Sequence, residues 1–293
     1  MPAAETATAA NAPATFPAPS AANVAPAAPA VVAPLLRVEN LVVRFPARGG
    51  LFGGSREMVA AVDDVSFEIG RGQIVALAGE SGSGKTTTGR AILKLAPVAA
   101  GKIIFDGVDI APLTPREFFP WRKRIQMVFQ DPWHSLNPRL TLESILAEPL
   151  EIHFPQLRAA ARRERVAELL RRVKLPLDMM RRHPHELSGG QRQRVGIARA
   201  VAVEPELLVC DEPVSALDVS VQAQIIALLR ELRAECGFAC LFVSHDLAVV
   251  EQLADGVLIM REGKIVERGE PAALYANPQH PYTRALLDAV PVF

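Results

Sequence analysis

The chain has 293 residues, of which 49% are hydrophobic, and its 32 basic and 32 acidic residues give a formal net charge of +0. This length is ample for a packed core in one or two domains, and the neutral balance gives no electrostatic case for binding nucleic acid or an anionic membrane. Three cysteines do not make a disulfide framework, which fits a reducing cytosolic compartment. Prolines interrupt the longest weakly apolar stretch, residues 21–36, so we expect neither a membrane span nor a secretory signal.

The first part of the chain predicts a tail followed by β-structure. Residues 1–34 are rich in Ala and Pro and nearly uncharged, so we expect a disordered tail that cannot bury enough surface to offset its ordering entropy. The patterns at 37–45 and 59–69 predict two strands on either side of a glycine-rich loop at 49–55, and a hairpin is expected over 101–108.

The stretch Gly79–Thr87, which reads GESGSGKTT, predicts a phosphate-binding loop. It follows an apolar run at 74–78 that is typical of a buried strand, and it precedes helical spacing over 88–95. Glycines let the backbone curl so that successive N–H groups face a phosphate, and a helix that begins near Lys85 adds its positive end. In such a loop Lys85 reaches the β- and γ-phosphates and the hydroxyl of Thr86 ligates Mg²⁺. We expect nucleotide contacts from Gly79, Glu80, Ser81, Gly82, Ser83, Gly84, Lys85, Thr86 and Thr87.

The rest of the chain alternates strand and helix patterns around a helical insertion. A strand at 125–129 ends at Gln130, and helical patterns then dominate from 131 to about 187, with an amphipathic segment at 158–173. The α/β pattern then returns, with helices predicted at 191–203 and 221–236, strands at 207–210 and 240–244, and a hairpin formed by 257–260 and 264–268.

Four polar features follow apolar strands directly or after one residue. They are Gly79, Gln130, Asp211 and His245. Because the C-terminal ends of parallel strands share one edge of a sheet, where ligands bind, we expect these residues to converge on one site.

An acidic pair ends the strand that reads LLVCDEP. Asp211 suits the shell of a Mg²⁺ ion, and Glu212 suits the acceptance of a proton from an attacking water. Two surface carboxylates without a function are the alternative, which the phosphate-binding loop upstream makes the weaker interpretation.

A second anion-binding feature opens a helix at Ser188-Gly189-Gly190-Gln191. Ser188 can cap this helix, and the glycines expose backbone N–H groups. One nucleotide rarely needs two such cradles in one chain, so we expect the second to serve the γ-phosphate of a nucleotide bound by a partner chain.

Taken together, these motifs resemble the nucleotide-binding subunit of ABC transporters, from about residue 36 to the C-terminus. The resemblance rests on GESGSGKTT, Gln130, LSGGQRQR, LLVCDEP, SALD and Ser244-His245, in this order. It implies an α/β fold: a P-loop NTPase core with an N-terminal antiparallel β subdomain and an inserted helical subdomain. It also implies an ATPase that binds ATP and Mg²⁺.

The resemblance assigns a role to each matching residue. Lys85, Gln130, Glu212 and His245 would be catalytic, with Glu212 as the general base and His245 on the γ-phosphate. Thr86, Gln130 and Asp211 would hold the metal. The residues that close over the partner's ATP or line the dimer interface would be Ser188, Gly189, Gly190, Gln191 and Asp218. An aromatic residue that stacks on adenine is expected shortly before residue 58, where Arg56 and Glu57 stand, so Phe52 or Phe45 is the expected substitute.

A finer resemblance concerns the transported solute. The runs QDP and SLNPR after the 125–129 strand, the run DEPVSALDVSVQAQI, and NPQHPYTRALL in a C-terminal tail at about 270–293 look like the dipeptide/oligopeptide importer branch. This implies transmembrane permease subunits, a second ATPase subunit that is expected to be a different chain, and indirectly a solute-binding protein, at the cytoplasmic face of the inner membrane.

Three alternatives stay open. A soluble ABC ATPase acting on nucleic acid or ribosomes would carry a long coiled-coil insertion or a second cassette, and the modest stretch between Thr87 and Leu187 is neither. A regulatory cassette without hydrolysis is disfavoured by the intact Glu212, His245 and Gln130. A transporter cassette for another small solute, such as nickel or glutathione, remains.

Overall fold

The computed structural model describes residues 33–46 and 58–289, apart from the side chains of Pro132 and His134. The described residues, from Ala33 onward, belong to one compact unit. The predicted tail, for the most part, and the predicted glycine-rich loop lie outside the described residues. None of the helices in the described part is both long and apolar enough to cross a bilayer.

An antiparallel sheet forms the N-terminal layer, as the sequence predicted. It contains β1 (Leu36–Pro46), β2 (Met58–Ile69), β4 (Ala100–Phe105) and β5 (Val108–Asp109), in the order β2-β1-β4-β5. The inward residues of β1 and β2 alternate with exposed ones, which is the pattern of a sheet with one buried face.

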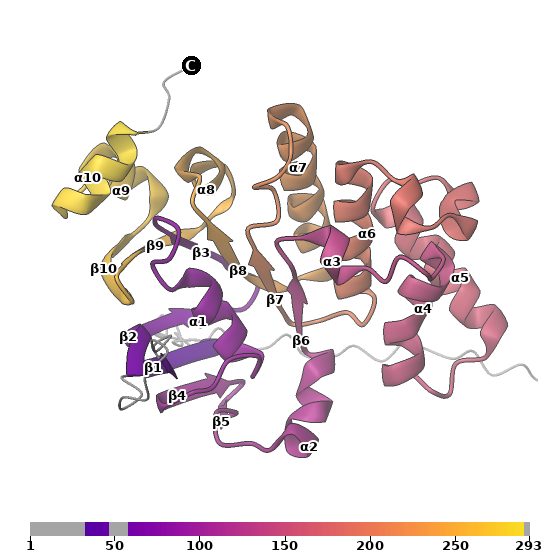
Figure 1. Ribbon diagram of the computed structural model, residues 1–293, viewed down its shortest axis with the longest axis horizontal. Helices are drawn as coiled ribbons and strands as arrows, with labels where there is room; N and C mark the ends of the chain where they lie inside the picture. The colour runs from indigo at the N-terminus through magenta and orange to yellow at the C-terminus, as the bar shows by residue number, and fades with distance from the viewer. Residues whose placement is uncertain (1–32, 47–57, 290–293) are drawn as a thin grey trace, which may run out of the picture. The chain divides into compact units, whose positions relative to one another are not determined.

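The second sheet has six strands in the order β10-β9-β3-β8-β7-β6 (Figure 1). The strands are β3 (Ile74–Ala78), β6 (Ile125–Val128), β7 (Leu207–Asp211), β8 (Ala239–Ser244), β9 (Gly256–Arg261) and β10 (Lys264–Gly269). All neighbours in it are parallel except β9 and β10, which form the predicted hairpin. Strands β3, β7 and β8 are buried along their whole length, because both faces of the sheet are covered.

The side chains of these strands alternate between the hydrophobic clusters on the two faces of the sheet. Val75 and Leu77 of β3 pack with the N-terminal sheet and with α1 (Lys85–Ile92). On the other face, Cys240 and Phe242 of β8 pack with α6 (Gly189–Val201) and α7 (Val219–Cys236). This period of two follows from the alternation of side chains along a strand.

The predicted helical insertion is present between β6 and α6. It contains α3 (Pro132–Ser135), α4 (Leu142–His153), α5 (Ala159–Arg172) and two short 3₁₀ helices, Leu177–Arg181 and Pro184–Glu186. A short α2 (Pro115–Phe118) and the 3₁₀ helix Phe119–Lys123 precede β6. Val166 and Leu170 on the apolar face of α5 join the core that α6 and α7 share, so the insertion packs through α6 onto the sheet (Figure 1).

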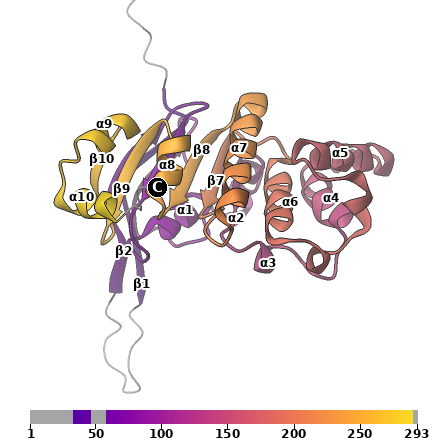
Figure 2. The ribbon, with the colours of Figure 1, turned by 90° about the horizontal axis from the view of Figure 1, so that it is seen from above.

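The last helices cover the other end of the large sheet. They are α8 (Leu247–Leu253), α9 (Pro271–Ala276) and α10 (Pro281–Asp288), and Figure 2 shows them beside β9 and β10. Leu274 and Tyr282 pack with Leu247, Val257 and Ile259 in a small core of their own.

One helix is shorter than predicted. The helix after the glycine loop ends at Ile92 rather than near residue 95, because Lys94 takes a left-handed conformation with φ +56°. Its ammonium group donates to the carbonyl of Ala111 at 2.6 Å, a contact between distant segments that periodicity cannot reveal.

Candidate nucleotide site

The predicted phosphate-binding loop connects β3 to α1. Two of its positions require glycine for steric reasons. Gly79 has φ +148°, and a Cβ there would lie 2.2 Å from the carbonyl oxygen of Met260; Gly84 has φ +107°, and a Cβ would lie 2.3 Å from that of Ala61. The tight turn therefore depends on the absence of side chains, and it directs the loop's backbone toward one cavity.

Lys85 is the first residue of α1, at the end of this loop, and is 3% exposed. Its Nζ donates to the carbonyl oxygens of Gly79 at 2.8 Å and Glu80 at 2.7 Å. Burial lowers the pKa of Lys85, while the nearby carboxylates of Glu212 and Asp211 oppose that shift. The ammonium group is thus held by neutral carbonyls that a phosphate can replace as the stronger partner.

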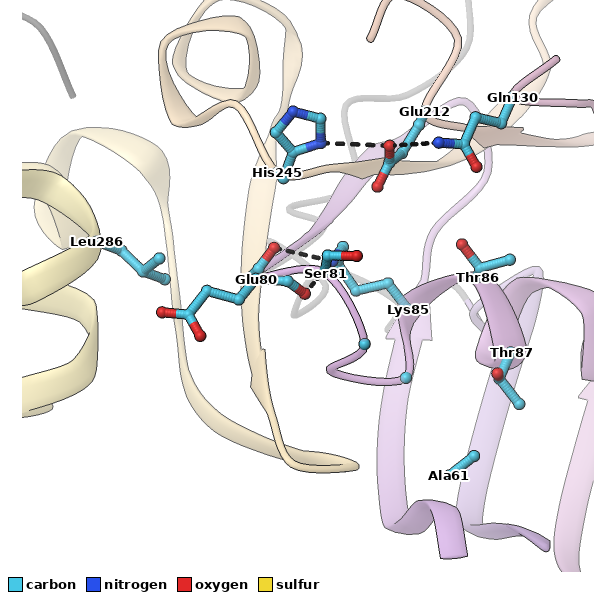
Figure 3. Close-up of a pocket in the computed structure, with 13 residues that line it drawn as sticks. Ala61, Glu80, Ser81, Lys85, Thr86, Thr87, Gln130, Glu212, His245 and Leu286 are labelled. Atoms are coloured by element: carbon cyan, nitrogen blue, oxygen red, sulfur yellow. Dashed lines mark hydrogen bonds and ion pairs between the residues drawn. The ribbon is translucent and has the colours of Figure 1, made fainter. Parts of the chain in front are cut away.

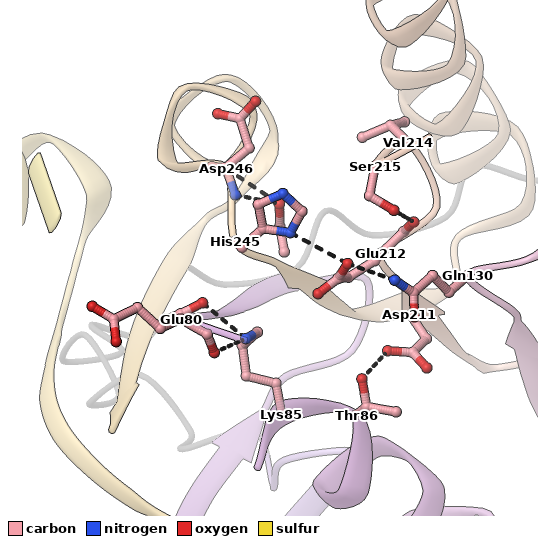
Figure 4. Close-up of polar contacts among 12 residues, drawn as sticks. Glu80, Lys85, Thr86, Gln130, Asp211, Glu212, Val214, Ser215, His245 and Asp246 are labelled. Carbon is pink, nitrogen blue, oxygen red and sulfur yellow. Dashed lines mark hydrogen bonds and ion pairs between the residues drawn. The ribbon is translucent and has the colours of Figure 1, made fainter. Parts of the chain in front are cut away.

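Asp211 ends β7 beneath the start of α1. Its Oδ1 accepts a hydrogen bond of 2.7 Å from the hydroxyl of Thr86 (Figure 4). Its Oδ2 is buried without a hydrogen-bond partner, and the guanidinium of Arg90 lies 3.9 Å away. Burial raises the pKa of Asp211. A buried carboxylate oxygen that accepts no hydrogen bond, together with a neighbouring hydroxyl, is the kind of hard-oxygen set that suits Mg²⁺.

Glu212 joins three strand ends into one cluster (Figure 4). Its Oε2 accepts from Nε2 of Gln130 at 2.9 Å and lies 3.2 Å from Nδ1 of His245. The residue has φ +44°, an uncommon conformation for a residue with a side chain, and its N–H donates to the carbonyl of Val243 on β8. The two adjacent carboxylates have different partners: Asp211 contacts Thr86, and Glu212 contacts Gln130 and His245.

These groups surround a cavity of about 500 Å³ (Figure 3). Its walls are formed by Ala61, Gly79, Glu80, Ser81, Gly82, Gly84, Lys85, Thr86, Thr87, Gln130, Glu212, His245 and Leu286. The strand ends converge as the sequence predicted, although the role of each residue stays a prediction. Ser83 and Asp211 lie beside the cavity rather than on its wall: Ser83 is buried against Lys85, and Asp211 is reached through Thr86.

The second predicted anion cradle lies elsewhere in the chain. Among the described residues that line the cavity, none belongs to Ser188–Gln191, and Asp218 is absent too. Ser188 caps α6 as predicted: its hydroxyl accepts from the N–H of Gln191 at 3.3 Å, and the Gln191 side chain accepts from the N–H of Ser188 at 3.0 Å. Asp218 is exposed at the N-terminus of α7.

Sequence reasoning missed two walls of the cavity. Ala61 comes from β2 and Leu286 from α10, within the NPQHPYTRALL run whose pattern indicates only the class of solute. Apolar residues in a surface run carry no signal for a nucleotide. Phe45, one substitute for the adenine-stacking aromatic, is 39% exposed and does not line the cavity; Phe52, the other, lies outside the described residues.

Comparison with known proteins gives two family matches. Residues 62–215 match the ABC transporter family, and residues 266–293 match the C-terminal region of oligopeptide/dipeptide transporters. A Brucella ovis protein named "Putative peptide import ATP-binding protein" is 51% identical over 258 residues, which cover 88% of this chain and 79% of the relative. The glutathione import ATP-binding protein GsiA of Shigella flexneri is 52% identical over 261 residues, 88% of this chain and 41% of GsiA.

Solved structures with the same fold include ATP-binding cassettes. The dimeric post-hydrolysis state of the cassette MJ0796, bound to ADP and Pi, has a TM-score of 0.72 at 28% identity and covers 80% of this chain and 98% of its own. The protein cbiO1 of Clostridium perfringens, part of the ABC transporter complex cbiONQ, has a TM-score of 0.72 at 28% identity, covering 83% of this chain and 91% of its own. The predicted fold class is confirmed.

Proposed function

The chain belongs to the ABC transporter family, and from this premise we propose that it is the ATP-hydrolysing subunit of an importer for dipeptides or oligopeptides. As a member of this family it binds ATP and hydrolyses it to ADP and phosphate. The observation that carries the choice of solute is the match of residues 266–293 to the oligopeptide/dipeptide transporter C-terminal region, supported by relatives named for peptide import.

The glycine loop is proposed to bind the phosphates of ATP. Residues of the loop and of the first turn of α1 line the cavity, and the N-terminus of a helix favours a negative charge. Lys85 leaves the carbonyls of Gly79 and Glu80 and donates to the β- and γ-phosphates instead.

Thr86, Asp211 and Gln130 are the residues that would hold Mg²⁺. The Oδ2 of Asp211 supports this assignment, because it is buried and accepts no hydrogen bond, and its ion-pair partner Arg90 is no closer than 3.9 Å. When bound, Mg²⁺ supplies positive charge that stabilises the phosphoryl oxygens in the transition state.

Glu212 is the proposed general base. Its carboxylate is held on two sides, by the amide of Gln130 and the imidazole of His245, so it is oriented toward the cavity before substrate arrives (Figure 4). A water between Glu212 and the γ-phosphate would give its proton to the carboxylate as it attacks phosphorus. His245, whose side chain is 51% exposed at the cavity wall, would then also donate to the γ-phosphate.

A second ATPase subunit, expected to be a different chain, completes each site. The capped N-terminus of α6 with Ser188, Gly189 and Gly190 would cover the partner's ATP, and Asp218 would lie at the interface. Because ATP then contacts both subunits only when they meet, its binding favours the closed pair.

The permease subunits have a suitable docking groove next to Gln130. A groove of about 410 Å³ runs between the segments 93–95, 118–129 and 148–153. Three large apolar side chains on it are exposed, Leu95 at 56%, Phe119 at 46% and Ile152 at 51%. Its lining includes Phe129, so a permease helix seated there would touch the segment that carries Gln130 into the nucleotide site.

Replacing Lys85 with alanine is expected to weaken ATP binding by roughly 10- to 100-fold, the factor that charge-assisted hydrogen bonds to phosphate contribute. Titration with a fluorescent ATP analogue measures the affinity of each variant. Lys102→Ala, on the exposed part of β4, is the control and should bind ATP as the unmodified chain does. Unchanged affinity in Lys85→Ala would remove this residue from the phosphate site.

Replacing Phe119 with glutamate is expected to reduce permease-stimulated ATPase activity by about tenfold or more, because a charge replaces an exposed apolar side chain that lines the groove. Basal activity of the isolated chain should not change. Val108→Glu on β5, where Val108 is 42% exposed outside the groove, is the matched control. Equal stimulation of both variants would place the permease elsewhere.

The solute is tested in the assembled transporter with its binding protein. Dipeptides and oligopeptides are expected to stimulate ATP hydrolysis and to accumulate in vesicles. Similarity to GsiA makes glutathione the second candidate, so the same assay compares glutathione and Ni²⁺. Stimulation by glutathione alone would replace the peptide assignment and leave the ATPase assignment intact.

A further inference from the structure

The C-terminal segment touches the glycine loop itself. The hydroxyl of Tyr282, on α10, accepts a hydrogen bond of 2.9 Å from the backbone N–H of Glu80. The neighbouring Leu286 lines the nucleotide cavity on the side of Glu80 (Figure 3). Helix α10 therefore meets the second residue of the loop from outside the strand-loop-helix unit that forms it.

Tyr282 is fixed in place by several contacts. It is 7% exposed, its ring packs in the small core with Leu274, and the guanidinium of Arg261 lies 5.0 Å from the ring centroid. The N-terminus of α10 is anchored as well, because the carboxylate of Glu267 on β10 accepts from the N–H groups of residues 279 and 280, at 2.7 Å and 3.0 Å. The hydroxyl is thus a rigid acceptor rather than a chance surface contact.

The two hydrogen bonds at the start of the loop hold one peptide unit from opposite sides. The carbonyl of Gly79 accepts from Lys85, and the N–H of Glu80, which belongs to the same peptide, donates to Tyr282. Gly79 has φ +148° and no Cβ, so no side chain of its own fixes the orientation of this peptide. When Lys85 turns to the phosphates, the hydroxyl of Tyr282 is the restraint that remains on this N–H.

We propose that Tyr282 is a positioning residue for ATP binding: it holds the Gly79–Glu80 peptide in its phosphate-binding orientation while Lys85 moves to the nucleotide. The inference rests on the proposed function of the loop and adds a residue that lies about 200 positions away in sequence. It makes the C-terminal segment, and α10 in particular, part of the ATPase site.

The test compares two tyrosines of one segment. Tyr275 on α9 is the other tyrosine of the chain, and its hydroxyl donates to the carbonyl of Leu247, away from the glycine loop. Tyr282→Phe and Tyr275→Phe each remove one hydroxyl and one hydrogen bond from the same small core, so both should lower the melting temperature. Only Tyr282→Phe removes a contact to the loop.

The expected result is a rise in the KM for ATP and in the Kd for ADP of about three- to tenfold for Tyr282→Phe, the factor one hydrogen bond contributes. At saturating ATP its kcat should stay within about twofold of the unmodified chain, because the general base is unaffected. Tyr275→Phe should have the same KM for ATP as the unmodified chain. KM does not depend on the amount of folded enzyme, so partial unfolding of either variant leaves the comparison valid.

Equal KM values for the two variants overturn the inference, because the hydroxyl of Tyr282 then contributes only stability. If the unmodified full-length chain hydrolyses no ATP, the proposed function fails and this inference fails with it. Hydrogen exchange of the Glu80 amide with ADP bound gives an independent readout: faster exchange in Tyr282→Phe than in Tyr275→Phe is expected, and equal exchange contradicts the proposal.

Discussion

Replacing Glu212 with glutamine is expected to leave ATP binding intact and to slow ATP hydrolysis by roughly 10²- to 10⁴-fold, the usual contribution of a general base. Glutamine keeps the size of the side chain and its ability to accept from Gln130, so the hydrogen bond of 2.9 Å between these residues can persist. What disappears is the carboxylate that accepts the proton of the attacking water. The variant should therefore accumulate bound ATP and a closed pair of subunits.

Single-turnover hydrolysis and nucleotide titration separate these effects. Glu164→Gln, at an exposed position of α5, is the matched control with the same change of charge, and it should hydrolyse ATP normally. Near-normal turnover in Glu212→Gln would show that another group takes the proton. A lost affinity for ATP would show instead that Glu212 acts in binding.

Much of the nucleotide site could be predicted from the sequence, because the loop and the strand ends are recognisable from short stretches of residues. The glycines at 79 and 84, the apolar strand before them and the helix after them form a local pattern that predicts the loop, although the carbonyls that exclude a Cβ at these glycines come from Met260 and Ala61. The parallel strand order then brings Gln130, Glu212 and His245 to the same edge. Strand ends in a parallel sheet converge by topology, so their meeting could be predicted before any coordinates.

What the sequence could not provide are contacts that depend on tertiary packing. Asp211 contacts Thr86 while the adjacent Glu212, at φ +44°, contacts Gln130 and His245, and no periodicity signals this backbone conformation or these partners. The hydrogen bond from Glu80 to Tyr282 joins segments that are distant in the chain, and the HPYT run that contains Tyr282 has no pattern of a nucleotide-binding element. The hydrogen bond from the Lys94 ammonium to the carbonyl of Ala111 likewise joins separate segments, whereas the left-handed turn at Lys94 that ends α1 is closed by local backbone hydrogen bonds.

Association with the second ATPase subunit should depend on the charge at the N-terminus of α6 rather than on the stability of that helix. Ser188 is the N-cap there, and both aspartate and asparagine cap helices about as well as serine. In Ser188→Asp, however, a carboxylate would face the γ-phosphate of the partner's ATP. Like charges set against each other across an interface cost several kcal/mol, so ATP-driven association with the second ATPase subunit should weaken by roughly 10²- to 10³-fold.

Ser188→Asn differs from Ser188→Asp mainly in charge and should reduce association far less. Both variants should bind ATP in their own cavity as the unmodified chain does, because Ser188 does not line it. Sedimentation of the paired subunits with ATP measures association, and nucleotide titration of this chain alone measures its own site. If Ser188→Asp instead lost affinity for ATP in its own cavity while still pairing with the second subunit, the anion cradle at Ser188–Gln191 would act within its own chain. The proposal of a site shared between two subunits would then be wrong.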